Sequence, residues 1–311
     1  MRHLRSDTDL DAASFARVLQ LGRAIKRRPA DYRDRLAGQS VAAIFAKPST
    51  RTRVSFEVGI YQLGAQALVL ATSGAGGLQV GRGETVADTA QVMSRYVHAI
   101  VIRTFAQAEV DELAARGAVP VINALTDSFH PCQALADAMT MQEHFGDLHG
   151  RKLVFVGPGN NVSHSLLLAG PRGGFDVVCA CPPSAPPDPA IFARAQADAK
   201  EAGTRVSVEH DVVAAVAGAH VVYTDTWVSM GQEADRASLL ARLRPYSVTQ
   251  AVMEAAGKDA VFMHCLPAHR GEEVAAEVLD GPRSVIFDEA ENRLHVQKAL
   301  LLLLLEAEPW E

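Results

Sequence analysis

At 311 residues, 48% of them hydrophobic, the chain is long enough to form two domains with complete cores. Its net charge of −6, from 30 Lys and Arg against 36 Asp and Glu, provides no basic field of the kind that binds nucleic acid. The four cysteines form no C-x-x-C pair and are too few for a secreted disulfide framework, so we expect reduced thiols.

The N-terminal sequence predicts a helix and no targeting segment. MRHLRSDTDLDAASF is charged and lacks the apolar core of a secretory signal, so we expect a cytoplasmic protein. Thr8 followed by Asp11 suits a capping box, and apolar residues at helical spacing then predict a helix that ends near Arg28.

Short apolar runs follow, separated by amphipathic stretches of helical length, a pattern typical of parallel β-α units. The expected strands cover residues 40–46, 67–71, 99–104, 119–125, 152–157, 175–181, 205–210, 220–225, 260–265 and 284–289. The pattern pauses at 144–152, where we place the domain boundary. The predicted fold is α/β with two domains, each a mainly parallel sheet flanked by helices. The first covers 1–144 and is completed by a returning C-terminal helix over 289–311, and the second covers 145–288.

The C-terminal run ALLLLLLEAE, from Ala299, is the only long apolar segment. It is much shorter than the roughly 20 residues that span a bilayer, and it ends in acidic residues. We therefore expect a buried terminal helix and no membrane partner.

The loops that follow strands are where ligands bind in open parallel sheets. After the first strand, KPSTRTRVSFE (47–57) opens a helix that Ser49 or Thr50 can cap. Free amides at a helix start, with hydroxyls and a guanidinium, form a phosphate cradle, although an ordinary capped helix with exposed arginines fits the composition equally well. Arg51 and Arg53 cannot face the same way on a helix, and Arg51 is nearer the free amides.

Three further strand ends carry polar side chains. His130 and Gln133 are three residues apart on a starting helix, so both can face one pocket, although a lone histidine is more often structural. Arg103, at the end of another strand, suits either a salt bridge or the stabilisation of a carbonyl oxygen that becomes negative. Asp225 ends a strand where a carboxylate can pair with an ammonium or cap the next turn.

The loop VGPGNNVSHS (156–165) has the Gly157-x-Gly159 start of a dinucleotide motif. Val162 occupies the third glycine position, and the following strand ends in Cys181-Pro182 where an acid for ribose is expected. An NAD-linked dehydrogenase is therefore disfavoured.

Four segments together resemble ornithine carbamoyltransferases, in order and spacing, over nearly the whole chain. They are STRTR (49–53), SFHPCQALAD (128–137), TDTWVSMGQE (224–233) and MHCLPAHRGEE (263–273). STRTR alone indicates a carbamoyltransferase, whereas Ser-Met-Gly and His-Cys-Leu-Pro narrow the resemblance to the ornithine branch. The resemblance implies transfer of the carbamoyl group of carbamoyl phosphate to the side-chain amine of L-ornithine, giving L-citrulline and phosphate, without metal or organic cofactor.

The resemblance also implies a carbamoyl phosphate site. Its expected ligands are Ser49, Thr50, Arg51, Thr52, Gln79, Arg103, His130, Gln133, Cys265, Leu266 and Arg293. Thr52, Arg103 and His130 would stabilise the carbonyl oxygen, and Gln133 would hold the carbamoyl nitrogen. Gln79 would reach the site of a neighbouring subunit, so we expect a homotrimer.

The expected ornithine ligands are Asn161, Asp225, Ser229 and Met230. Pro158 stands where the family has aspartate, which leaves the choice between Asn160 and Asn161 open. Cys265 is expected among the catalytic residues through its backbone carbonyl and not as a nucleophile, because no base is poised to form its thiolate. Other carbamoyltransferases and a non-catalytic protein of the same fold remain as alternatives. The sequence does not say whether the cell uses the reaction to make or to break down citrulline.

Overall fold

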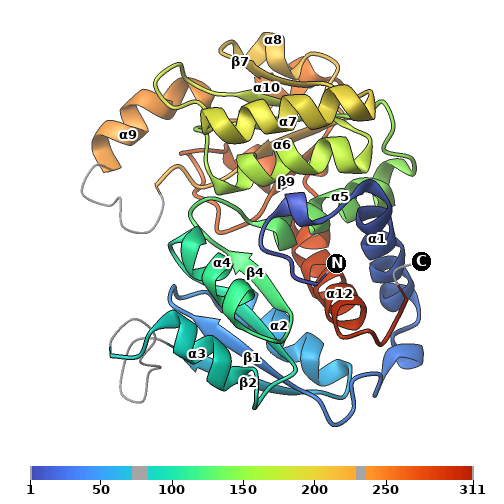
Figure 1. Cartoon of the computed structure of the whole chain (residues 1–311). Coiled ribbons are helices and arrows are strands. Elements are labelled where there is room, and N and C mark those ends of the chain that lie inside the picture. Colours follow the sequence, from blue (N-terminus) through green and yellow to red (C-terminus); the bar gives the residue numbers. More distant parts are fainter. Residues whose placement is uncertain (1, 72–82, 229–235, 310–311) are drawn as a thin grey trace. The chain divides into compact units, whose positions relative to one another are not determined.

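The computed structural model describes residues 2–71, 83–228 and 236–309, which form two compact units (Figure 1). Unit 1 comprises Met1–Met139 and Asn292–Glu311, and unit 2 comprises Thr140–Glu291. Three residues expected in the site, Gln79, Ser229 and Met230, lie outside the described residues.

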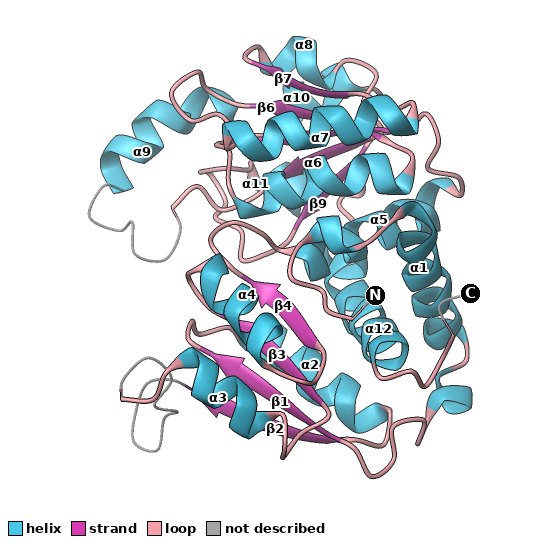
Figure 2. Ribbon diagram, viewed as in Figure 1, coloured by secondary structure: helices cyan, strands magenta, loops and turns pink. Residues whose placement is uncertain are grey.

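Unit 1 contains a four-stranded parallel sheet in the order β2-β1-β3-β4 (Figure 2). Its strands are β1 (Ser40–Phe45), β2 (Gln66–Ala71), β3 (Ala99–Arg103) and β4 (Val121–Leu125). Its helices are α1 (Ala12–Arg27), α2 (Thr50–Gln62), α3 (Val86–Met93), α4 (Gln107–Arg116), the first part of α5 (Pro131–Phe145) and most of α12 (Ile286–Leu304). Short 3₁₀ helices cover Asp7–Asp9 and Pro29–Tyr32.

Helices cover the sheet of unit 1 because its strands are apolar on both faces. Ala42 and Ile44 of β1 and Ile100 of β3 belong to one hydrophobic cluster with residues of α3 and α4, which lie together on that face in Figure 2. Val41 and Ala43 alternate with them and are equally buried, and α2 packs on β1 and β2. Parallel strands buried on both faces require this continuous apolar composition.

Unit 2 contains a five-stranded parallel sheet in the order β7-β6-β5-β8-β9. Its strands are β5 (Lys152–Val156), β6 (Asp176–Ala180), β7 (Val206–Glu209), β8 (Val221–Thr224) and β9 (Val261–His264). Its helices are α6 (Asn161–Gly173), α7 (Pro189–Ala202), α8 (Val212–Val216), α9 (Arg236–Leu243), α10 (Gln250–Ala256) and α11 (Ala276–Leu279), with a 3₁₀ helix at Arg244–Tyr246. One sheet face packs against α8 and α10, and α6 lies on β6 beside α7 (Figure 1).

Each sheet has one topological switch point, where consecutive connections leave in opposite directions. In unit 1 it lies between β1 and β3, and in unit 2 it lies between β5 and β8. The carboxyl ends of these strand pairs are where open α/β sheets bind ligands. The predicted α/β fold, with two mainly parallel sheets and a C-terminal helix that returns to the N-terminal region, is confirmed.

Two local predictions were wrong. Residues 284–289 were expected to form a strand, but only Ser284 bridges to Phe262, and α12 begins at Ile286. The buried carboxylate of Glu289 lies in the first turn of α12, where it accepts hydrogen bonds from Tyr223 and from the His264 amide. The first helix is capped by Asp11, whose side chain accepts from the Ser14 amide, and not by Thr8.

The C-terminal leucine run is buried, as expected. Leu300, Leu301, Leu302 and Leu303 are each 0% exposed within α12. Among the described residues, no helix is both long enough and apolar enough to cross a membrane.

The close packing of α6 on β6 leads to a stability prediction for Gly170→Ala. A Cβ at Gly170 would lie 2.6 Å from Val177 Cγ2 and 2.9 Å from the Phe175 carbonyl oxygen. Overpacking of this kind costs about 1 to 3 kcal/mol, so we expect the free energy of unfolding to fall by that amount in urea denaturation.

Gly22→Ala, in the middle of α1, is the matched control. Its nearest contact would be 3.1 Å from the flexible Met139 sulfur, and alanine favours a helix by about 1 kcal/mol over glycine. Gly22→Ala should therefore be nearly neutral. Equal effects of the two substitutions would contradict the packing argument.

Candidate functional site

The start of α2, directly after β1, forms the first part of the site. Ser49 is the N-cap, and its side chain accepts a hydrogen bond from the Thr52 amide at 3.3 Å. No acidic residue occupies the first turn, so the positive end of the helix dipole is not offset by a carboxylate of its own turn. Arg53 is exposed and lies 3.6 Å from Glu57, one turn later on the same helix. The start of α2 therefore suits an anion, and Arg53 belongs to the surface of the helix.

Arg293 of α12 joins three of the expected site residues. Its guanidinium donates to Thr52 Oγ1 at 2.7 Å and to Gln133 Oε1 at 2.5 Å. It also lies 3.2 Å from His130 Nε2. All three partners are neutral and Arg293 is only 4% exposed, so they accept hydrogen bonds from both terminal nitrogens of the guanidinium without neutralising its charge.

The electrostatics of His130 show how much positive charge gathers here. Burial and the charges of Arg293, Arg103 and Arg51 hold the pKa of His130 well below its usual 6.5. The imidazole is therefore neutral at pH 7. Because Arg293 donates to Nε2, the ring proton resides on Nδ1, which is the atom able to donate to another group.

Arg103 completes this group at the end of β3. It is 9% exposed, and its guanidinium donates to Thr52 Oγ1 at 3.4 Å. Thr52 thus accepts from two guanidiniums that come from distant parts of the chain. We call Ser49, Thr52, Arg103, His130, Gln133 and Arg293 the cationic cluster. It suits an anion with a carbonyl oxygen that two guanidiniums and an imidazole could polarise.

Lys47 is a residue of this region whose role the sequence did not reveal. It is 6% exposed, forms an ion pair with Asp127, and places its ammonium 4.2 Å from the centre of the Phe105 ring. These three residues follow β1, β4 and β3, so Lys47 ties together the loops around the start of α2. Its position directly before Pro48, in the same motif as Arg51, was the available signal.

The second group of expected residues lies in unit 2, where Asp225 follows β8. Its Oδ2 accepts from Asn160 Nδ2 at 2.8 Å, and its Oδ1 accepts from the Cys265 thiol at 3.0 Å and from the Thr226 amide at 2.7 Å. We call Asn160, Asp225 and Cys265 the acidic cluster. The Cys265 thiol is thus held by a hydrogen bond to the Asp225 carboxylate.

His264 supports the turn that carries Leu266. Its Nδ1 accepts from the Leu266 amide at 2.8 Å, and Leu266 adopts a left-handed conformation with φ of 59°. Atoms of Asp225, His264 and Cys265 that could bind a metal lie within 4.8 Å of one another. Since the carboxylate, the thiol and Nδ1 already form hydrogen bonds within the protein, we interpret them as a hydrogen-bonded network.

The structure separates the roles of the two neighbouring asparagines. Asn160 is the N-cap of α6, and its side chain is used by the helix amides and by Asp225. Asn161 is the first residue of α6 and is partly exposed. The side chain that caps α6 is therefore that of Asn160 and not that of Asn161.

The glycine-rich turn after β5 packs against another segment of the chain, which occupies the place that a nucleotide would need. The Gly159 amide donates to the Ala185 carbonyl at 2.9 Å, and a Cβ at Gly159 would lie 2.3 Å from the Pro187 nitrogen. Gly159 is therefore required by the proline-rich segment that follows β6. A pyrophosphate would need this amide and this space.

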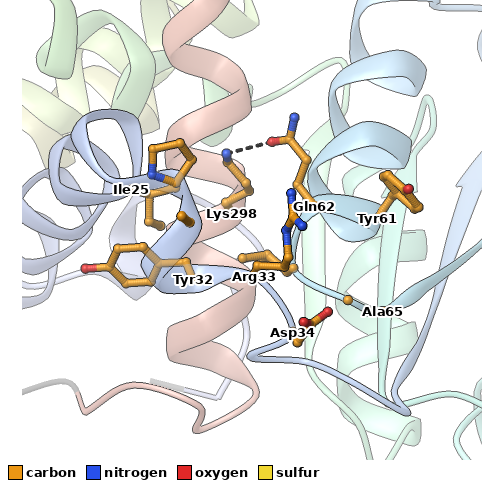
Figure 3. Close-up of a pocket in the computed structure, with 12 residues that line it drawn as sticks. Ile25, Tyr32, Arg33, Asp34, Tyr61, Gln62, Ala65 and Lys298 are labelled. Carbon is orange, nitrogen blue, oxygen red and sulfur yellow. Dashed lines mark hydrogen bonds between the residues drawn. The ribbon is translucent and has the colours of Figure 1, made fainter.

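A hollow of about 700 Å³ in unit 1 contains none of the expected site residues (Figure 3). It is lined by the end of α1, the 3₁₀ helix at Pro29–Tyr32 and the end of α2, with Lys298 at its side. Lys298 donates to Gln62 Oε1 at 2.8 Å, as Figure 3 shows. The hollow lies at the C-terminal end of α2, whereas the cationic cluster uses the N-terminal end.

Comparison with known proteins identifies the family to which both parts of the chain are similar. Residues 2–143 match the aspartate/ornithine carbamoyltransferase, carbamoyl-P binding domain, and residues 149–304 match the Asp/Orn binding domain of the same family. The ornithine carbamoyltransferase of a Parafrankia species is 52% identical over 310 residues, which cover 98% of this chain and 96% of the relative. That of Methanothermobacter thermautotrophicus is 53% identical over 302 residues, which cover 97% of this chain and 98% of the relative.

A solved structure, ornithine carbamoyltransferase from Pyrococcus furiosus, superposes with a TM-score of 0.94 at 48% identity and covers 98% of this chain and 97% of that chain. Both family domains are thus matched in order, and relatives about half identical extend over nearly the whole chain. The chain therefore belongs to the aspartate/ornithine carbamoyltransferase family and, within it, to the ornithine carbamoyltransferases.

Proposed function

We propose that the cationic cluster binds carbamoyl phosphate and the acidic cluster binds L-ornithine, so that the two halves of the chain carry out the transfer that forms L-citrulline and phosphate. The observation that supports this most directly is Arg293, a buried guanidinium whose three partners are neutral. A bound anion would supply the missing charge. The domain of residues 1–144 with 289–311 would hold carbamoyl phosphate, and 145–288 would hold ornithine.

The phosphate group would lie at the start of α2, on the amides and hydroxyls of Ser49, Thr50 and Thr52, with Arg51 beside it. The carbonyl oxygen would accept from Thr52, Arg103 and His130, and the carbamoyl nitrogen would meet Gln133 and the backbone carbonyls of Cys265 and Leu266. Arg293 would adjoin the carbamoyl group. Gln79, from a neighbouring subunit, would complete the phosphate contacts.

Ornithine would enter after carbamoyl phosphate. Its α-amino acid end would bind Asn161, Asp225, Ser229 and Met230, and its neutral δ-amine would attack the carbonyl carbon. A carbon–nitrogen bond forms, the carbon–oxygen bond to phosphate breaks, and phosphate leaves with that electron pair while the amine loses a proton. Fixed donors around the oxygen and the positioning of both substrates would supply most of the acceleration.

The test of this assignment is citrulline formation by three arginine variants. One well-placed oxyanion donor contributes about a hundred- to a thousandfold in rate, so Arg103→Ala should lower kcat by roughly that factor. Arg51→Ala should lose orders of magnitude in kcat/KM for carbamoyl phosphate, because it removes a charge-assisted contact to phosphate.

Arg53→Ala is the matched control, since Arg53 lies on the same helix but pairs with Glu57 at the surface. It should retain near-normal turnover with ornithine. Near-normal turnover of Arg51→Ala or Arg103→Ala would refute that residue's role, and a preference for aspartate or putrescine over ornithine would refute the substrate.

The pH dependence follows from the same chemistry. An amine attacks only when neutral, so turnover under ornithine-limited conditions should rise about tenfold per unit between about pH 6 and pH 8. His130 is not the group that titrates, because its pKa is already well below 6.5 and its neutral form persists across this range.

Citrulline formation measured against pH for the wild type and for His130→Gln checks this. Glutamine also donates a hydrogen bond, so the variant should be slower but should keep the same slope. A flat wild-type profile, or a slope that disappears in His130→Gln, would contradict the assignment.

We propose a homotrimer, and an apolar strip on the surface of unit 1 suits an interface between its copies. Val54, Val58 and Tyr61 lie on one face of α2 and are 51%, 37% and 77% exposed. A hollow of about 620 Å³ runs beside them, against residues 65–67 at the start of the edge strand β2. Exposed apolar surface next to an open sheet edge is typical of an interface, and a second copy would cover it.

Val58→Glu should separate the subunits, because it places a charge in this apolar strip. Sedimentation should show monomers. The rate of citrulline formation should fall as well, because Gln79 would no longer reach the phosphate site of the neighbouring subunit. Val213→Glu, at a valine that is 59% exposed on α8, is the control and should leave both mass and activity unchanged. A Val58→Glu protein with the wild-type mass would overturn the interface.

We also propose a cytoplasmic location. None of the four cysteines, all of which the structure describes, forms a disulfide, and each is buried. Reduced thiols suit a reducing compartment.

A further inference from the structure

The carboxylate of Asp225 is fixed by donors at both of its oxygens. Oδ1 accepts from the Cys265 thiol and from the Thr226 amide, whereas Oδ2 accepts from Asn160 Nδ2 at 2.8 Å. Thr226 is its chain neighbour and Cys265 follows β9, so Asn160 is the contact that comes from the β5–α6 turn. This bond crosses the switch point of the sheet in unit 2.

We propose that Asn160 is a positioning residue that orients Asp225 toward the ammonium group of ornithine. The inference rests on the proposed function, in which Asp225 is the carboxylate that receives the substrate. A carboxylate held at both oxygens presents its remaining lone pairs in a fixed direction. The side chain therefore loses less conformational entropy when the ammonium binds.

The orientation of the Asn160 amide is determined by its surroundings. Its Oδ1 accepts from the Val162 amide at 3.1 Å and from the Ser163 amide at 2.9 Å. The Ser163 side chain accepts in turn from the Asn160 backbone amide, which completes a capping box. The oxygen must therefore face the start of α6, which leaves the NH₂ group for Asp225. One side chain thus caps the helix and holds the carboxylate.

Only asparagine combines these two functions among the residues that commonly cap helices. Serine, threonine and aspartate also accept hydrogen bonds from the first amides of a helix, but at this position they would have no NH₂ group to give to Asp225. If Asn160 served the helix alone, these residues would replace it without kinetic effect. The two roles can therefore be separated by substitution.

The groups that face Asp225 come from two elements, β9 and α6. From β9 these are the Cys265 thiol and the His264 ring, whose atoms lie within 4.8 Å of the carboxylate. From α6 the facing group is the neutral Asn160 amide. Asn160→Asp would replace this amide by a second carboxylate, and a like charge raises the pKa of its neighbour.

The experiment compares Asn160→Ser and Asn160→Asp with the wild type by kcat, the KM for ornithine between about pH 6 and 9, carbamoyl phosphate affinity and Tm. Loss of a hydrogen bond to a charged group corresponds to roughly a ten- to hundredfold change, so both variants should raise the KM for ornithine by about that factor. In Asn160→Asp the profile of kcat/KM for ornithine should also become steeper than that of the wild type at its acid end, because protonation of Asp225 would weaken ammonium binding in addition to the effect of the protonated δ-amine. Carbamoyl phosphate affinity should be unchanged.

Asp211→Ser is the matched control, because Asp211 caps α8 in the same unit through the Ala214 amide. It should change Tm at most and leave every kinetic constant unchanged. A normal KM for ornithine and an unchanged pH profile in both Asn160 variants would overturn the inference.

Asp225→Asn separates this inference from the proposed function. Full activity of Asp225→Asn would remove the carboxylate from the ornithine site and refute both. An inactive Asp225→Asn together with normal Asn160→Ser and Asn160→Asp would refute the role of Asn160 alone.

Discussion

The buried charge of Arg293 is the constraint on which the cationic cluster depends. A guanidinium cannot lose its proton at physiological pH, and burying it among neutral partners costs several kcal/mol. Its bonds to Thr52, Gln133 and His130 use both terminal nitrogens of the guanidinium but leave the charge in place. Burial, together with this charge and those of Arg103 and Arg51, keeps His130 neutral. Carbamoyl phosphate would supply the compensating charge, so binding of this anion and stability of unit 1 are thermodynamically linked.

The two clusters have opposite polarity, and each lies at the switch point of its sheet. At the ends of β1 and β3, guanidiniums face neutral acceptors, which suits an anionic substrate. At the ends of β5 and β8, a carboxylate is held by neutral donors, which suits a substrate with an ammonium group. Parallel sheets place the ends of such strands side by side, so residues far apart in sequence meet there without long loops. In the proposed function, the polarity of each cluster would select its substrate.

Much of this arrangement could be predicted because it depends on local patterns. The nine strands of the described sheets each began as a short apolar run, and Ser49 was one of the two residues, with Thr50, that were expected to cap α2. The strand expected at 284–289 was wrong because its apolar start resembles a strand, whereas burial of Glu289 against Tyr223 and His264 is a tertiary effect. The roles of Lys47 and Asn160 were missed for the same reason. Each depends on partners that come from other strand ends.

The position of Arg293 near the end of the chain has a consequence for how the site forms. It lies 241 residues from Thr52, so the cationic cluster remains incomplete until α12 packs on α2. Gly59 makes that packing close, since a Cβ there would meet Lys298 Cγ at 3.2 Å and Leu294 Cδ1 at 3.3 Å. The bond from Lys298 to Gln62 then holds the far end of α2 to the same helix. Contacts of such sequence separation form late because of their loop-closure entropy, so the sheet of unit 1 can fold before it is able to bind its anion.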